Sequence, residues 1–335
     1  MRALRTAGRV LLVAPFAFVG AWVWLGPPTF EGGLFGLALL VACGAFVARR
    51  RAVALGGLAV AVSLVMARLL FAAEGHHLRV DDGWWIDRVL PERDVALGAS
   101  RLLLLAGVVD EPGMLEALRD GYDRLRDEEG WVPSPSLSTL VHDPTPDDFT
   151  TLAIPGTRDD AAVVFLHGSM GSVTVACWQV SRAASARGLT TVCPSTDLSG
   201  RWDRTGGRAI LDVTLRRLSE RGVRRVVIVG LSAGGIGLSR LAPRLRMPNE
   251  MTLAGVVQLS GTAAPTHPRR VRTLVLQGGR DTMTPPGPAR RHARALGSLG
   301  ELVEIPEASH WLLLSHPEAV DEALGAFLER TLPGP

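Results

Sequence analysis

Three long apolar runs dominate the first 75 residues of this 335-residue chain. They cover residues 10–26, 30–47 and 52–73, and short connections rich in proline, glycine or arginine separate them. A bilayer core requires about 20 apolar residues in helical form, which the third run meets and the first two approach. We therefore expect three transmembrane helices in residues 1–75. A cleaved signal peptide is the alternative for the first run, and it would leave a mature N-terminus near residue 27.

The basic residues predict the orientation of these helices, because cytoplasmic loops carry an excess of positive charge. Three arginines precede the first run and three more fill the second connection at residues 49–51, whereas the only charged residue around the first connection is Glu31, at the start of the second run. Both basic clusters therefore belong on the cytoplasmic side, and the chain leaves the third helix on the outer side. Arg68 lies near the end of the third run, and we expect its side chain to extend toward the outer interface.

The charge of the chain does not indicate a nucleic-acid partner. The formal net charge is +3, and every basic residue is an arginine, since the sequence contains no lysine. These arginines alternate with acidic residues, as they do on solvated helix faces. No basic stripe with interleaved aromatic residues is present, so we expect no nucleic-acid binding.

The three cysteines, Cys43, Cys177 and Cys193, form no CxxC pair, so the spacing typical of metal ligands is absent. Cys177 and Cys193 could form a disulfide if this part of the chain lies outside the cytoplasm. Two buried free thiols are the alternative.

Behind the apolar runs, residues 76–130 form a polar connecting segment with two helical patterns, at 91–108 and 111–129. In residues 131–335, apolar strand candidates alternate with helical stretches, which predicts an α/β fold with a mostly parallel sheet in a three-layer sandwich. The strand candidates are residues 136–141 and 150–154, which could pair as a hairpin, then 162–166, 190–193, 225–229, 254–259, 272–277 and 301–305. The helices are expected at 173–187, 206–221, 234–245, 289–299 and 317–332.

A glycine-rich turn, GLSAGG, joins the strand candidate at 225–229 to the helix that follows. The dinucleotide-binding pattern fails here, because its glycine spacing places Ser232 or Arg240 where a glycine is required. A Walker-type phosphate loop fails because the chain has no lysine. The pattern that fits is G-x-S-x-G, with Gly230, Ser232 and Gly234 in a strand–turn–helix context that exposes a nucleophilic serine.

A serine nucleophile needs a base, and the base needs an orienting acid. Asp281 follows the strand candidate at 272–277, and His310 follows the one at 301–305. Both therefore belong at the same edge of the sheet as Ser232, in the chain order serine, acid, histidine that this turn requires.

Other candidates fit less well. His267 precedes the acid, His292 lies inside a helical stretch, and His316 stands at a helix start. Asp197, which follows an earlier strand, is the reserve acid.

The sequence HGSMGS at residues 167–172 directly follows the strand candidate at 162–166. An acyl-transfer site needs two amide donors for the developing oxyanion. The residue after the nucleophile, Ala233, would supply one, and Ser169 the other. His167 is then interpreted as a residue that shapes the loop.

These motifs, His167–Ser169, Gly230–Gly234, Asp281 and His310, resemble those of the α/β-hydrolase fold superfamily. The resemblance covers residues 131–335, about 60% of the chain, and implies a Ser-Asp-His triad acting on an ester, thioester, amide or similar bond. Many relatives insert a lid before the acid loop, but residues 260–271 are too few for one, so we expect a domain without an inserted lid and an exposed serine.

We therefore expect a membrane-anchored serine hydrolase that cleaves an ester or thioester of a small-molecule or lipid-like acyl substrate, with no metal and no organic cofactor. A peptidase or acyltransferase on the same triad is one alternative. A non-catalytic, hydrolase-like binding module is the other.

Overall fold

The computed structural model describes residues 2–72, 75–111, 113–248, 250–263 and 271–334. The chain divides into two compact units, which we call the helical unit (residues 1–73 and 88–110) and the sheet unit (residues 74–87 and 111–335). This division differs from the three segments expected from the sequence, because residues 76–130 are shared between the two units.

The helical unit contains the three apolar runs as helices α1 (Arg2–Val23), α2 (Phe30–Val47) and α3 (Arg51–Phe71), followed by α4 (Glu92–Leu105). The first three are long and apolar enough to cross a bilayer. They expose large apolar side chains, among them Leu11 and Leu55, as expected of helices that contact lipid rather than water.

A carboxylate on helix α4 binds the connection between α1 and α2. Asp94 accepts hydrogen bonds from the backbone amide of Thr29 at 2.9 Å and from its hydroxyl at 2.6 Å. Thr29 is also the residue that caps α2, since its hydroxyl accepts from the Gly32 amide at 3.1 Å. The start of α2 and the first turn of α4 are therefore fixed by one buried acid.

Arg68 lies in the last turn of α3, and its extension toward an outer interface stays a prediction. Arg68 is buried, with its Nε donating to the carbonyl of Arg88 at 3.1 Å and its Nη1 lying 3.6 Å from Glu31 Oε2. A buried guanidinium is tolerated when it is paired and hydrogen-bonded. The sequence could not indicate these partners, because residues 68 and 31 are distant in the chain.

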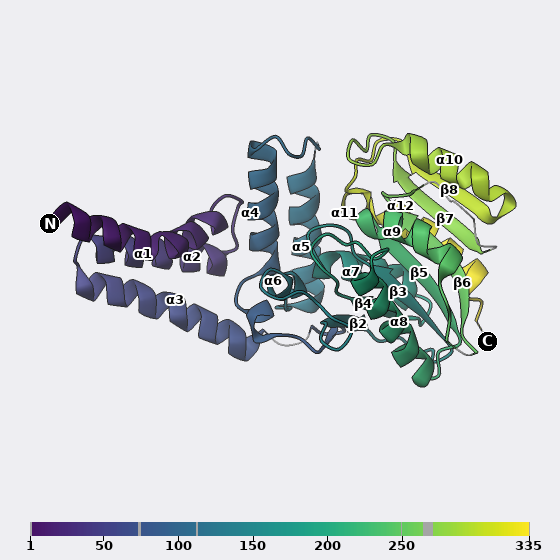
Figure 1. Cartoon of the computed structure of the whole chain (residues 1–335), viewed down its shortest axis with the longest axis horizontal. Helices are drawn as coiled ribbons and strands as arrows, with labels where there is room; N and C mark the ends of the chain where they lie inside the picture. The colour runs from purple at the N-terminus through teal and green to yellow at the C-terminus, as the bar shows by residue number, and fades with distance from the viewer. Residues whose placement is uncertain (1, 73–74, 112, 249, 264–270, 335) are drawn as a thin grey trace. The chain divides into compact units, whose positions relative to one another are not determined.

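The sheet unit is built on eight strands in the order β1-β2-β4-β3-β5-β6-β7-β8. Strands β2 to β8 are labelled in Figure 1. Strand β2 runs antiparallel to both of its neighbours, and all other pairs are parallel. The strands are β1 (Arg79–Asp81), β2 (Thr151–Ile154), β3 (Ala161–Leu166), β4 (Thr190–Pro194), β5 (Arg225–Leu231), β6 (Thr252–Leu259), β7 (Arg272–Gly278) and β8 (Gly300–Ile305). The predicted mostly parallel α/β sheet is confirmed.

One strand prediction is wrong. Residues 136–141 do not form a hairpin with β2; the chain forms the short helix α6 (Pro135–Thr139) there. Proline suits the first turn of a helix, and the carboxylate of Asp87 accepts a hydrogen bond from the Ser138 amide at 2.8 Å. Strand β2 pairs instead with β1, a three-residue strand that no sequence pattern indicated.

Helices cover both faces of the sheet, as a three-layer sandwich requires. Alternate strand residues such as Val164, Ile228 and Val256 pack into one core with α8 and α9, and Val275 packs on the same face against α10. Helices α7 and α12 contact one another and cover the opposite face. These elements are α7 (Thr174–Ser185), α8 (Thr205–Glu220), α9 (Ala233–Leu241), α10 (Pro286–Leu296) and α12 (Pro317–Thr331). The remaining ones are α5 (Met114–Glu129), α11 (Leu312–Ser315) and the 3₁₀ turns Trp85–Arg88, Ala242–Arg244 and Gly297–Leu299.

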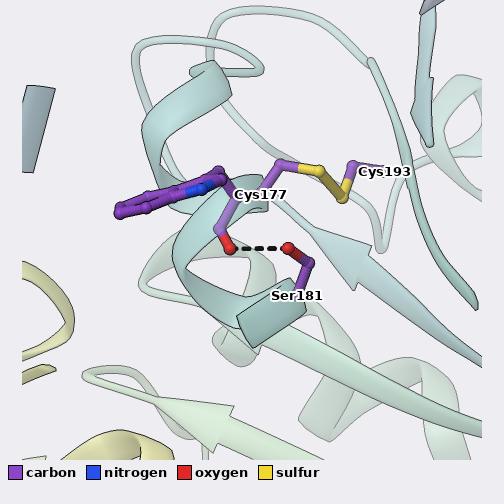
Figure 2. Close-up of a disulfide and its surroundings, with 4 residues drawn as sticks. Cys177, Ser181 and Cys193 are labelled. Atoms are coloured by element: carbon purple, nitrogen blue, oxygen red, sulfur yellow. Dashed lines mark hydrogen bonds between the residues drawn. A yellow bond between two sulfur atoms is a disulfide. The ribbon is translucent and has the colours of Figure 1, made fainter. Parts of the chain in front are cut away.

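Cys177 on α7 and Cys193 on β4 form a disulfide, with 6.1 Å between their Cα atoms (Figure 2). Both side chains are buried. The sequence left open either a disulfide or two free thiols, and the structure contains the disulfide. Cys43 is a free, buried thiol in α2.

The connection between β6 and β7 spans residues 260–271. The expectation that it carries no lid, and the rival histidine His267, fall largely on residues 264–270, which lie outside the described residues.

Candidate active site

Ser232 lies in the turn between β5 and α9, and its backbone is strained. Its φ is 51° and its ψ is −116°, a region that non-glycine residues rarely adopt and that is typical of functional turns. The Ser232 amide donates to the carbonyl of Leu259 on β6 at 2.8 Å, which helps to hold the turn at the carboxyl edge of the sheet. The side chain is partly exposed.

The two glycines of the G-x-S-x-G motif are required by close backbone contacts. A Cβ atom on Gly230 would lie 2.7 Å from the carbonyl of Gly234, and one on Gly234 would lie 2.6 Å from the carbonyl oxygen of His167. Real Cβ atoms do not approach so closely. The motif is therefore explained by the tight packing of β5, α9 and the loop after β3.

Ser232, His310 and Asp281 come together in one chain of contacts. His310 Nε2 lies 3.0 Å from Ser232 Oγ, and His310 Nδ1 lies 3.0 Å and 3.1 Å from the two carboxylate oxygens of Asp281. Asp281 and His310 are buried. Because Nδ1 faces a carboxylate, it carries the proton, and Nε2 is left to accept one from the serine hydroxyl.

The Asp281 carboxylate is well supplied with donors. The Nε2 of Gln277 donates to Oδ2 at 2.9 Å, and the Thr284 amide donates to Oδ1 at 2.7 Å. Burial acts to raise the pKa of Asp281, but the hydrogen bonds and charge of His310 and the Thr284 donors outweigh it and lower the pKa. The acid is therefore held in its ionised form, which is the form that orients an imidazole.

The loop at residues 167–172 lies directly beside the serine. A Cβ atom on Gly168 would lie 3.0 Å from the Cβ of Ser232, and Ser169 follows on the exposed part of this loop. Ala233 is the first residue of α9, where amides lack a partner within the helix. Both residues that were expected to donate to an oxyanion thus belong to segments that adjoin Ser232.

His167 shapes this loop, as expected. Its Nε2 accepts from the Thr196 amide at 3.0 Å, so Nδ1 bears the proton and donates to the Gly168 carbonyl at 2.7 Å. Complete burial lowers the pKa of His167 to about 4. It is neutral near pH 7, and its ring packs edge-on against the ring of Trp202.

The rival residues lie elsewhere. Asp197, the reserve acid, caps its own loop by accepting from the Ser199 amide at 2.8 Å. His292 is buried within α10, and His316 directly precedes the first residue of α12. A cavity of about 530 Å³ lies between residues 143–144, 196–197 and 203–207, near the loop that holds Asp197. In the described part of the chain, no cluster of three or more His, Cys, Asp or Glu side chains could hold a metal.

Besides Gln277, two contributors were not indicated by the sequence pattern. Thr284 contacts Asp281, and Glu111, from the segment before α5, contacts the loops of both Asp281 and His310. Thr284 lies three residues after the acid, so a turn pattern could have indicated it. Nothing local indicated Glu111.

A family model described as TAP-like protein, of the Abhydrolase_4 family, matches residues 252–333, which include Asp281 and His310. This match covers strands β6, β7 and β8, and the reversed β2 and the strained serine turn after β5 lie in the part of the sheet unit outside it. The sheet unit has the α/β-hydrolase fold.

Solved α/β-hydrolase structures resemble the chain at low identity. A lidless α/β serine hydrolase from Xanthomonas campestris is 18% identical, covers 56% of this chain and 91% of its own, and has a TM-score of 0.45. An esterase from Pyrococcus furiosus is 15% identical over 57% of this chain and 90% of its own, with a TM-score of 0.46. The Est1E protein of Butyrivibrio proteoclasticus is 15% identical over 58% of this chain and 100% of its own, with a TM-score of 0.46. No curated protein matches the chain.

Proposed function

We propose that this protein is a membrane-anchored serine hydrolase that cleaves a carboxylic ester or thioester. One observation carries the proposal: the imidazole of His310 lies between Ser232 Oγ and the Asp281 carboxylate, with 3.0 Å contacts on both sides. A nucleophile, a base and an orienting acid in this arrangement are what acyl transfer requires.

In the proposed reaction, Ser232 Oγ attacks the acyl carbon while His310 Nε2 takes the hydroxyl proton. The C–O or C–S bond to the leaving group then breaks, and His310 returns the proton to the leaving group. Water, activated by the same nitrogen, hydrolyses the acyl-enzyme and restores the serine. Asp281 keeps the ring oriented and stabilises its charged form in each half-reaction.

The amides of Ala233 and Ser169 are proposed to donate to the oxyanion. Ala233 begins α9, so its amide lies at the positive end of a helix dipole. Ser169 lies one residue from Gly168, which packs against the nucleophile. The loss of one such donor typically costs roughly 2.7–4 kcal/mol of transition-state stabilisation.

The helical unit is proposed to anchor the chain as three transmembrane spans, with the N-terminus cytoplasmic and the sheet unit outside. The arginine distribution supports this orientation, and so does the disulfide between Cys177 and Cys193, since such bonds persist in oxidising compartments. A small-molecule or lipid-like acyl substrate fits an enzyme held at a bilayer. Protease added to intact cells is expected to degrade the sheet unit; full protection would contradict the orientation.

Labelling with a fluorophosphonate tests the proposed activity. The full-length wild type is expected to label covalently and to hydrolyse p-nitrophenyl acetate, and Ser232→Ala is expected to abolish labelling and to cut ester turnover by at least ~10³-fold. Ser260→Ala is the matched control, because Ser260 also follows a strand of the same sheet but lies outside the proposed triad. A folded wild-type protein that does not label would favour a non-catalytic binding module. Faster turnover of peptides than of esters would favour a peptidase.

A further inference from the structure

Glu111 is a buried carboxylate between the loops that carry Asp281 and His310. Its Oε1 accepts hydrogen bonds from the Thr282 amide at 2.6 Å, from the Thr282 hydroxyl at 2.5 Å and from the Met283 amide at 3.1 Å. Its Oε2 accepts from the His310 amide at 3.2 Å. Glu111 is only 3% exposed.

These contacts constrain the backbone of both loops. A buried carboxylate is costly unless donors surround it, and an ionised carboxylate can only accept hydrogen bonds. Three of its four donors are backbone amides, and they belong to His310 and to the two residues directly after Asp281. The Glu111 side chain therefore holds the backbone at the base, His310, and directly after the acid, Asp281.

The two loops are also paired at their base, where the Gly279 amide donates to the Ile305 carbonyl and the Arg280 amide to the Ala308 carbonyl, each at 2.9 Å. Glu111 links them further out, at residues 282–283 and 310. It thereby extends the pairing of the loops to the level of the Asp281–His310 contact.

Glu111 is itself held in place by the helix that follows it. Helix α5 packs against α11, which begins two residues after His310. Arg124 on α5 donates to the Leu314 carbonyl at 3.0 Å, and Gly121 allows the Leu314 side chain to approach closely. The helix that follows Glu111 is therefore fixed to α11, which follows His310.

We propose that Glu111 is a positioning residue that sets the contact between Asp281 and His310 and so directs His310 Nε2 at Ser232. The inference rests on the proposed hydrolase activity, because it assigns Glu111 a role in that reaction. Glu111 touches no reacting atom; it acts through the two loops.

The test compares Glu111→Gln with Glu129→Gln in the full-length protein. Glutamine keeps the shape of Glu111, but its side-chain amide has only one acceptor oxygen. Its NH₂ group, a donor, would face a protein donor where Glu111 has an acceptor oxygen. Glu129 is an equally buried carboxylate of the sheet unit, and it accepts from the amides of His77 and Leu78 beside β1. Both variants are expected to lose thermal stability. Only Glu111→Gln is expected to lower kcat for p-nitrophenyl acetate, by roughly 10- to 100-fold with KM nearly unchanged, and to slow fluorophosphonate labelling in parallel.

A wild type that labels, combined with equal kcat and labelling rates in the two variants, overturns the role of Glu111 and leaves the proposed function standing. A wild type that neither labels nor turns over ester overturns the proposed function itself, and this inference with it. If Glu111→Gln does not fold, Glu111→Asp serves in its place: it keeps the charge but is one methylene too short to reach both loops, and the same comparison applies.

Discussion

The backbone amide of Thr284 donates to Asp281 Oδ1 at 2.7 Å, and the Thr284 hydroxyl lies 2.7 Å from Oδ2. The same hydroxyl lies 2.7 Å from the carbonyl oxygen of Ser260, so its single proton is shared between two acceptors. Thr284 therefore contacts both oxygens of the acid that faces His310, and it connects the acid loop to the end of β6.

Replacing Thr284 with valine removes the hydroxyl and preserves the shape of the side chain. A hydrogen bond to a charged group contributes about 1.5–3 kcal/mol. If this contribution is lost in the transition state, kcat/KM for a p-nitrophenyl ester falls roughly 10-fold or more. Thr214→Val is the control, because the buried Thr214 hydroxyl donates to the Ile210 carbonyl within α8. Equal activity of the two variants would show that the Thr284 hydroxyl does not support the acid.

The identity of the acid is tested by comparing Asp281→Asn with Asp197→Asn. An asparagine at 281 cannot stabilise a charged imidazole and favours the wrong tautomer, so we expect turnover to fall roughly 10⁴-fold. Asp197 binds its own loop at Ser199, and its replacement should leave turnover close to that of the wild type. If Asp197→Asn lowered turnover more than Asp281→Asn in a steady-state assay, Asp197 would be the acid of the triad.

Much of the candidate site could be predicted because its signals are local. Gly230, Ser232 and Gly234 stand together in the chain, and Asp281 and His310 each follow an apolar strand whose carboxyl end must reach the same sheet edge. In a parallel sheet, strand order then brings together residues that are far apart in sequence.

The features that could not be predicted depend on distant partners. Residues 136–141 were expected to form a strand, yet the buried Asp87 carboxylate accepts a hydrogen bond from the Ser138 amide within a helix. The three residues of β1 are too few to show a period. The role of Glu111 depends on loops that lie about 170 and 199 residues further along the chain, and no local pattern reports such contacts.

The buried His167 should make stability depend on pH. Its folded-state pKa is about 4, because burial disfavours the charged ring, whereas a free histidine titrates near 6.5. Between these values the unfolded chain binds a proton that the folded chain does not, so stability falls as pH falls. From pH 7 to pH 5 the loss attributable to His167 is about 2 kcal/mol. Urea unfolding at both pH values should show this loss in the wild type and a smaller one in His167→Gln; an equal loss in both would contradict it.

The disulfide between Cys177 and Cys193 should stabilise the sheet unit. It closes a loop across a sequence separation of 16 residues, and a loop of that length restricts the unfolded chain by about 3 kcal/mol. The double variant Cys177→Ala, Cys193→Ala should therefore unfold at lower urea concentration than the wild type. A reductant should lower the wild-type midpoint toward that of the double variant and leave the double variant unchanged, since Cys43 is not part of the bond. Identical midpoints for the two proteins with and without reductant would mean that the cysteines are free thiols, and the orientation of the sheet unit would then rest on the arginines alone.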